Sequence, residues 1–339
     1  MPMLLANPEP IEHWDGLWHR SPRDYYLCLL LCSPTMDWTL QYVISYLAFL
    51  VFVLGVWKRW WSPKTVAVVT GSNRGIGFAI ARQLGRHGLH VIITSRHSDE
   101  GQAAMLLLQK EGLNVNHHPL DVLDSTSVKL FAEWILENYE GLDILVNNAG
   151  VNFNTGSDNS VEFAERVIET NYFGTKRVIE SMVPLMRSAF NARIVNTSSR
   201  LGRLNGRRNR LGDVNQRKQL SDDSQLCEEL IDVTVGKFLE EVKNGCWESG
   251  GWPQIYTDYS VSKLAVNAYT RLIAKKLSIE HERKICVNCY CPGWVKTAMT
   301  GWAGNMTTEE GADTAVWLAL FPGEPPTGKF FAERREISF

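Results

Sequence analysis

A tyrosine and a lysine, Tyr259 and Lys263, stand four residues apart in a stretch whose continuation, residues 264–269, favours a helix. Positions i and i+4 lie on the same face of a helix, so the phenol and the ammonium are expected side by side. A cation about 4 Å away in an effective dielectric of about 20 stabilises a phenolate by up to about 4 kcal/mol. That would lower the pKa of the phenol from its usual value of about 10 toward the range that suits general acid–base catalysis. The same spacing also occurs on ordinary helix faces, so the rest of the chain must decide its meaning.

A glycine-rich turn follows the first β-branched run of the chain. Residues 65–70 favour a buried parallel strand, residues 71–77 form the turn, and residues 78–85 favour a helix. Strand, glycine turn and helix together are the setting in which such a loop binds the pyrophosphate of a dinucleotide at the helix N-terminus. Three glycines would allow, in order, the turn, the approach of the backbone to the pyrophosphate and the packing of helix on strand. They are Gly71, Gly75 and Gly77.

The second predicted strand, residues 90–96, indicates which dinucleotide the chain prefers. An acidic residue at the end of this strand would hold the ribose 2′-hydroxyl of NADH, and the strand ends instead in Arg96. Arg96 and Arg74 in the glycine turn offer positive charge to a 2′-phosphate. The residues therefore predict NADPH, the alternative being that either arginine is a solvated surface charge.

Strands and helices continue to alternate beyond this point. Strands are expected at 115–120, 142–146 and 192–197, and helices at 127–140 and 162–187. This rhythm predicts a single-domain α/β fold, a doubly wound parallel sheet of the Rossmann type. Ligands of that fold lie beyond the carboxyl ends of the strands. The candidate residues at those ends are Gly71, Asp121, Asn147 and Ser199.

Composition excludes several other classes. A formal net charge of −2 over 339 residues gives no sign of nucleic-acid binding. The seven cysteines lack the spacing of a disulfide scaffold. Cys286, Cys289 and Cys291 fall on a predicted buried strand, with no second cysteine or histidine pair to complete a tetrahedral site, so packing is favoured and no metal is expected.

Residues 65–331 resemble the classical short-chain dehydrogenases/reductases. The matching motifs, in chain order, are residues 70–77, 147–150, Asn171, Ser198-Ser199, Tyr259 with Lys263, and residues 291–297. Residues 229–232, 251–253 and 287–297 look most like the carbonyl-reductase-like plant branch of that family. Residues 1–60 have no counterpart in the soluble members.

The resemblance implies a catalytic set of four residues. Tyr259 would protonate the carbonyl oxygen as hydride arrives from the nicotinamide, and Lys263 would lower the pKa of that tyrosine and hold the nicotinamide ribose. Ser199, chosen over Ser198 as the second serine of the pair, would hydrogen-bond the substrate oxygen. Asn171 would hold a water that relays protons to Lys263; taken alone, it reads as a capping residue.

The resemblance also implies where the cofactor lies. Asp121 would contact the adenine, Asn147 the ribose side and Thr297 the carboxamide, although Asp121 alone also reads as a turn cap. The expected cofactor-binding residues are Gly71, Asn73, Arg74, Gly75, Ile76, Gly77, Arg96, Asp121, Val122, Asn147, Tyr259, Lys263, Pro292, Gly293, Val295 and Thr297.

An insertion at residues 200–255 separates Ser199 from Tyr259. Its first part carries five arginines, which suit a solvated loop or, less simply, a surface that binds anionic lipid. They are Arg200, Arg203, Arg207, Arg208 and Arg210. Its second part, residues 226–242, has apolar residues at helical spacing and is expected to pack over the active-site cleft and shape an apolar substrate pocket. In the related branch such an insertion covers the face that other members use to form tetramers, which implies a monomeric catalytic body.

The implied function is NADPH-dependent reduction of a hydrophobic ketone or aldehyde to an alcohol. The substrate is expected to be a bulky terpenoid-like or alkaloid-like carbonyl compound. The same site could work as an NADP-dependent alcohol dehydrogenase, and some members of the branch reduce a carbon–carbon double bond. A non-catalytic nucleotide-binding protein is the alternative of a different class; such proteins commonly lose the tyrosine or the lysine.

The N-terminal region predicts a membrane attachment. Residues 1–37 lack clear periodicity, and Trp38–Trp57 has no charged side chain and is long enough, as a helix, to span the roughly 30 Å of a bilayer core. Lys58-Arg59-Trp60-Trp61 then supplies basic and aromatic interface residues. We expect residues 38–61 to anchor residues 62–339 on the cytosolic side of a membrane, that of the endoplasmic reticulum. The alternatives are a helix lying in the membrane plane or docked on the body, an incorrect gene start, and a cytosolic protein.

Overall fold

The computed structural model describes residues 59–153, 160–187, 192–207, 209–279 and 285–339. Residues Arg59–Phe339 form one compact unit. The segments predicted at 1–37 and Trp38–Trp57 lie outside the described residues. Among those that are described, no helix has the length and apolar character needed to cross a membrane.

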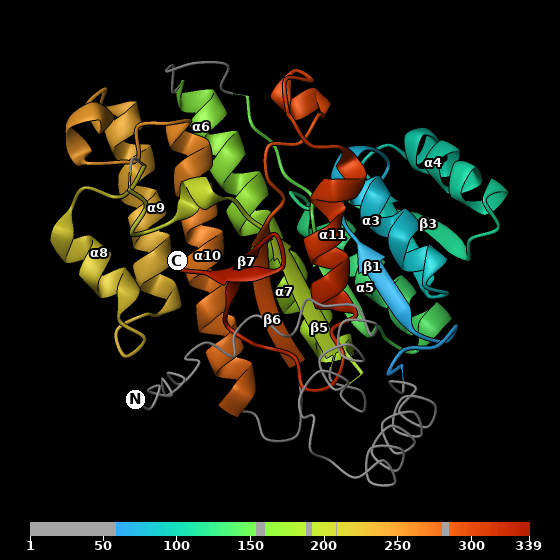
Figure 1. The fold of residues 1–339 in the computed structure, drawn as a ribbon. Coiled ribbons are helices and arrows are strands. Elements are labelled where there is room, and N and C mark those ends of the chain that lie inside the picture. Colours follow the sequence, from blue (N-terminus) through green and yellow to red (C-terminus); the bar gives the residue numbers. More distant parts are fainter. Residues whose placement is uncertain (1–58, 154–159, 188–191, 208, 280–284) are drawn as a thin grey trace, which may run out of the picture. The chain divides into compact units, whose positions relative to one another are not determined.

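The described residues form one mostly parallel sheet in the order β3-β2-β1-β4-β5-β6-β7-β8 (Figure 1). Neighbouring strands are parallel except β7 and β8, which pair antiparallel. The direction of winding reverses between β1 and β4, and a crevice opens at such a point. The predicted Rossmann-type sheet is confirmed. The strands are β1 (Val66–Val69), β2 (His90–Ser95), β3 (Val115–Pro119), β4 (Ile144–Asn147), β5 (Ala192–Thr197), β6 (Ile285–Cys291), β7 (Phe330–Ala332) and β8 (Arg335–Ile337).

Helices cover both faces of this sheet (Figure 1). One buried core joins the sheet to α5, α7 and α10 through residues such as Phe131, Ile179 and Leu264. The other joins it to α3, α4 and α11 through Ile80 and Ala315, among others. The helices are α3 (Gly75–Arg86), α4 (Ser98–Lys110), α5 (Ser125–Tyr139), α6 (Val161–Ile168), α7 (Thr175–Met182), α8 (Val214–Ser221), α9 (Glu228–Lys243), α10 (Thr257–Ile279) and α11 (Thr308–Ala319).

The long helix expected at 162–187 is interrupted by a π-turn at Glu169–Gly174, between α6 and α7. A π-turn inserts one extra residue into the helical repeat and re-aims the side chains within it. Here the turn contains Asn171, whose side chain is fully buried toward α10. The interruption therefore coincides with a candidate site residue.

The insertion packs against helices of the catalytic unit. Its main helix, α9, buries Ile231, Val235 and Phe238 in the core shared with α10. Its neighbours in space are α6 and α10, and Figure 1 shows α8 and α9 at that side of the molecule. The predicted apolar face is present. The expectation that the insertion shapes the substrate pocket stays a prediction.

Trp60 and Trp61, expected at the end of the membrane anchor, contact the catalytic unit. The guanidinium of Arg193, at the start of β5, lies 3.9 Å from the ring centroid of Trp60. The indole N–H of Trp61 donates to the carbonyl of His87, at the end of α3, at 3.3 Å. The compact unit thus begins at residue 59 rather than at the expected residue 62.

Candidate active site

A cavity of about 560 Å³ opens at the carboxyl ends of β1, β2 and β4. It is lined by the following predicted cofactor residues: Gly71, Asn73, Arg74, Gly75, Ile76, Arg96, Asp121, Val122 and Thr297. The structure thus gathers residues spread over more than two hundred positions of the chain around one space.

The glycine turn fits a pyrophosphate. Gly71 and Gly75 have φ of +59° and +61°, a backbone region in which a side chain is strained. A Cβ on Gly71 would also lie 2.9 Å from the Cα of Ala149, and one on Gly77 would lie 2.4 Å from the Nδ2 of Asn148. Helix α3 begins at Gly75 with no side chain capping its first N–H groups and no acidic residue in its first turn. These donors are free to bind an anion.

Two arginines supply positive charge at the rim of the cavity. Arg74 and Arg96 are exposed, and among the described residues neither forms an ion pair. By contrast, Arg82, which also lines the cavity, is paired with Glu111 and Glu309. The guanidinium groups of Arg74 and Arg96 are therefore available to pair with a ligand anion. The 2′-phosphate of NADPH is such an anion.

Tyr259, Ser199 and Lys263 form a group beside the carboxyl end of β5. The hydroxyl of Tyr259 hydrogen-bonds with Ser199, and the Nζ of Lys263 lies 5.5 Å from the centroid of the tyrosine ring. Both Tyr259 and Lys263 come from α10, one turn apart, as their spacing predicts. Lys263 donates a hydrogen bond of 2.8 Å to the carbonyl of Thr197, which fixes its side chain against the strand end.

The two adjacent serines have different surroundings. Ser198 is fully buried and its Oγ donates to the Oδ1 of Asn267 at 2.6 Å. Ser199 is half-buried and is the serine that reaches Tyr259. Ser198 thus holds the loop while Ser199 is available to a ligand, which agrees with the choice made from the motif.

Burial changes the ionisation expected from spacing alone. It raises the pKa of Tyr259 well above its usual value of 10.0, despite the hydrogen bond with Ser199 that lowers it. It lowers the pKa of Lys263 from 10.5 to about 8. The sequence predicted that the ammonium of Lys263 would lower the pKa of the Tyr259 phenol. In this structure that pKa is raised instead, because desolvation disfavours the charged forms of both side chains.

Asn171 stands at the back of this group. Its Oδ1 accepts from the backbone N–H of Val151 at 2.8 Å, and its Nδ2 donates to the carbonyl of Val151 and to the Oγ of Ser262. A Cβ on Gly150 would lie 3.1 Å from the Oδ1 of Asn171 and 3.7 Å from the Nζ of Lys263. Asn171 therefore fastens the loop after β4 to the helix of Lys263. The water relay remains a prediction.

Seven predicted cofactor residues do not line the cavity: Gly77, Asn147, Tyr259, Lys263, Pro292, Gly293 and Val295. Asn147 is the last residue of β4 and points into the sheet, where its Nδ2 donates to the Oδ1 of Asn196 at 2.8 Å. Val295 is buried in a bridge with Met306. Pro292 and Gly293 line a separate cavity of about 270 Å³. A contact of these positions with the cofactor stays a prediction.

Sequence reasoning missed several lining residues, most of them chain neighbours of predicted ones. Asn148, next to Asn147, lines the cavity and its Nδ2 donates to the carbonyls of Thr70 and Gly71. Ser95 and Leu120 adjoin Arg96 and Asp121 in the same way. The alternation of sides along a strand was the signal that could have separated them. Phe78, Lys296, Met299 and Trp302 also line the cavity.

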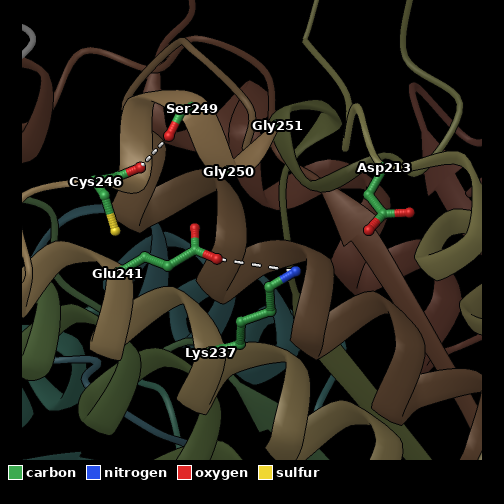
Figure 2. Close-up of a pocket in the computed structure, with 7 residues that line it drawn as sticks. All are labelled: Asp213, Lys237, Glu241, Cys246, Ser249, Gly250 and Gly251. Carbon is green, nitrogen blue, oxygen red and sulfur yellow. Dashed lines mark hydrogen bonds and ion pairs between the residues drawn. The ribbon is translucent and has the colours of Figure 1, made fainter.

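A third cavity, of about 490 Å³, lies in the insertion and is lined by none of the predicted site residues (Figure 2). Its polar groups are engaged: Glu241 accepts from the indole N–H of Trp252 at 2.6 Å and pairs with Lys237 at 3.9 Å. Asp213 caps α8 by accepting from the backbone N–H groups of Asn215 and Gln216. These contacts give the cavity a structural explanation.

Comparison with known proteins places this arrangement among relatives. The model of the family "short chain dehydrogenase" matches residues 65–210. Carbonyl reductase [NADPH] 1 of Bos taurus is 38% identical over 82% of this chain and 99% of its own. The structure of salutaridine reductase from Papaver somniferum superposes with a TM-score of 0.72 at 37% identity, over 79% of this chain and 99% of that one. Menthone neomenthol reductase from Mentha piperita gives 0.67 at 34% identity, over 79% and 98%.

Proposed function

Because the chain belongs to the short-chain dehydrogenase/reductase family, we propose that it reduces a hydrophobic ketone or aldehyde to an alcohol with NADPH. The observation that carries the proposal is one arrangement. A phenol, a hydroxyl and an ammonium, from Tyr259, Ser199 and Lys263, meet beside a cavity lined by a glycine turn and two unpaired arginines.

Each side chain has a defined task in this reaction. When bound in the cavity, NADPH would supply the hydride that the carbonyl carbon accepts. Ser199 and Tyr259 hold the carbonyl oxygen from two sides, as donors aimed at the atom on which negative charge develops. Tyr259 gives its proton to that oxygen. Lys263, held by the carbonyl of Thr197, keeps a positive charge close to the phenolate that remains.

The protonated phenol of Tyr259 suits the donor role that carbonyl reduction requires. A phenol whose pKa is raised by burial is fully protonated at neutral pH and is ready to donate. Oxidation of an alcohol by the same site needs the phenolate, which burial disfavours. The names of the relatives, which are reductases, support reduction as the proposed direction.

The substrate class follows from the relatives. One is named as a carbonyl reductase, and two solved relatives are named for salutaridine and for menthone. Their names support a small hydrophobic carbonyl compound, of alkaloid or terpenoid type, as the substrate of this chain.

The function is tested by following NADPH absorbance with a panel of cyclic and acyclic ketones. We expect turnover of bulky ring ketones with NADPH and a kcat/KM at least tenfold lower with NADH, since each charged contact with the 2′-phosphate is worth on the order of tenfold or more. Replacing Arg96 with alanine should lower kcat/KM for NADPH by about that factor and leave NADH unchanged. Arg86→Ala is the matched control, because Arg86 is paired with Glu111 and does not line the cavity. Equal use of both cofactors by the parent would contradict the assignment of Arg74 and Arg96.

We also propose that Trp38–Trp57 attaches the protein to the membrane of the endoplasmic reticulum, with the catalytic unit in the cytosol. The support is the uncharged length of this segment and the basic residues that follow it. After carbonate extraction of cells that express the full chain, the protein should stay in the membrane pellet. Release into the supernatant would leave the cytosolic alternative.

The catalytic unit is proposed to be monomeric. Helix α9 packs on α6 and α10, and its apolar side chains are buried against them, so this face is not open to a second copy. Light scattering of detergent-solubilised protein at micromolar concentration would reveal a dimer or tetramer if the face were still used for assembly.

A further inference from the structure

The segment between β6 and α11 places an exposed tryptophan at the cofactor cavity. Trp302 lines the cavity and is 68% exposed, the largest fraction for any large apolar side chain among the described residues. Met299 of the same segment also lines the cavity and is 44% exposed. An indole left this open in a ligand cavity has apolar surface that a ligand can cover.

The backbone holds Trp302 there at a conformational cost. Its φ is +65°, directly after Gly301 at +56°, so two consecutive residues are left-handed. Tryptophan adopts this conformation rarely, and such strain persists where surrounding contacts impose it. The contacts are present: the N–H of Trp302 donates to the carbonyl of Thr297 at 2.9 Å, and Thr297 and Thr300 form a capping box. Trp302 is thus positioned by a built turn.

The position of this turn relative to the glycine loop indicates what the indole covers. A Cβ on Gly75 would lie 3.7 Å from the methyl carbon of Thr297. Thr297, at the start of the segment that carries Trp302, therefore lies against the glycine loop, where the pyrophosphate is expected. The two unpaired arginines serve the adenosine end, by the 2′-phosphate. The indole of Trp302 is therefore expected to contact the nicotinamide half of the dinucleotide.

We propose that Trp302 is a cofactor-binding residue whose indole covers the pyrophosphate and nicotinamide half of bound NADPH. The inference rests on the proposed function only in taking NADPH as the cofactor. The ring excludes water from one side of the cofactor, and its N–H is a donor suited to a phosphate oxygen. Exposed apolar surface is removed from water on binding, which adds to the affinity.

The test is equilibrium binding to the full chain, followed by fluorescence of NADPH and by calorimetry. Two ligands are compared: NADPH, and adenosine 2′,5′-bisphosphate, which lacks the nicotinamide half. The variants are Trp302→Ala, Trp302→Phe and Trp302→Gly, the last of which relieves the left-handed strain and guards against a folding defect. Trp294→Ala is the matched control, since Trp294 is on the same segment and 58% exposed but does not line the cavity.

We expect Trp302→Ala and Trp302→Gly to raise the Kd of NADPH about tenfold, with Trp302→Phe in between, because stacked aromatic contacts are worth roughly that factor. The Kd of adenosine 2′,5′-bisphosphate should change less than about twofold, and Trp294→Ala should bind both ligands like the parent. Unchanged NADPH binding in all Trp302 variants would overturn the inference, as would an equal loss for both ligands. A parent that binds no NADPH would refute the proposed function itself, which separates the two failures.

Discussion

Replacing Tyr259 with phenylalanine is expected to lower kcat for ketone reduction about 1,000-fold, within the range found when a general acid is removed. The phenol is the proton donor of the proposed reaction, and Ser199 beside it has no comparable acidity. The ring and its packing are retained, so NADPH should bind with a Kd within about twofold of the parent. Single-turnover absorbance with saturating NADPH and a ketone measures the chemical step directly.

Tyr290→Phe is the control for this variant. Tyr290 is a fully buried phenol on β6 whose hydroxyl accepts a hydrogen bond of 3.5 Å from Thr197, and it has no place in the proposed reaction. Its kcat should stay within about threefold of the parent. If Tyr259→Phe were as active as Tyr290→Phe, the phenol would not be the acid and the proposed mechanism would fail.

Replacing Lys263 with methionine is expected to move activity and stability in opposite directions. Activity should fall, on the order of a hundredfold, because the positive charge beside the phenolate is lost. Stability should rise at neutral pH, because burial lowers the pKa of Lys263 from 10.5 to about 8 in the folded protein. Below pH 8 the ammonium is carried by both states, and its desolvation disfavours the folded one.

The sign with pH follows from proton binding. Between about pH 8 and 10.5 the unfolded chain binds more protons at Lys263 than the folded protein, so the free energy of unfolding of the parent rises through this window. The rise amounts to about 3 kcal/mol for this one group. The free energy of unfolding of Lys263→Met should not show this rise with pH. At pH 7 the extra stability of the variant is reduced, because the hydrogen bond from Lys263 to Thr197 is lost.

Urea denaturation at pH 7 and pH 9.5 measures this difference. Lys275→Met is the matched control, because Lys275 is an exposed lysine on the same helix. The free energy of unfolding of this variant should change with pH as that of the parent does. Parallel profiles for Lys263→Met and the parent would show that the lysine keeps its ordinary pKa in the folded protein.

Local sequence signals predicted the parts of the fold that local structure determines. The β-branched run before Gly71 and the glycines after it need only chain neighbours to form a strand and a turn, and both were found as expected. The pairing of Tyr259 with Lys263 is likewise a property of one helix. Such features depend on period and on backbone freedom, which the sequence displays.

Features set by tertiary contacts were predicted less well. The lowered pKa of Lys263 and the raised pKa of Tyr259 arise from burial, which residue spacing does not reveal. The sequence shows that α9 has an apolar face, but it does not show that this face packs on α6 and α10. The π-turn around Asn171 has no distinct residue pattern.

Residue spacing also could not decide which of two adjacent residues in a motif lines the cavity. Asn147 and Asn148 are the same residue type in adjacent positions, and their roles differ only because β4 ends between them. The strand's last residue faces the sheet and the next one faces the cavity. A boundary error of one residue therefore exchanges a structural amide for a lining one.

The contact of Trp60 with Arg193 has a practical consequence for shortened forms of the protein. Arg193 is 2% exposed, burial lowers its pKa to about 10, and the indole covers its guanidinium on one side. A gene fragment cut at residue 62, where composition changes, would leave that cation facing an empty space at the foot of the sheet. Soluble versions for crystallisation or assay should therefore start no later than Arg59, so that the two indoles stay with the enzyme.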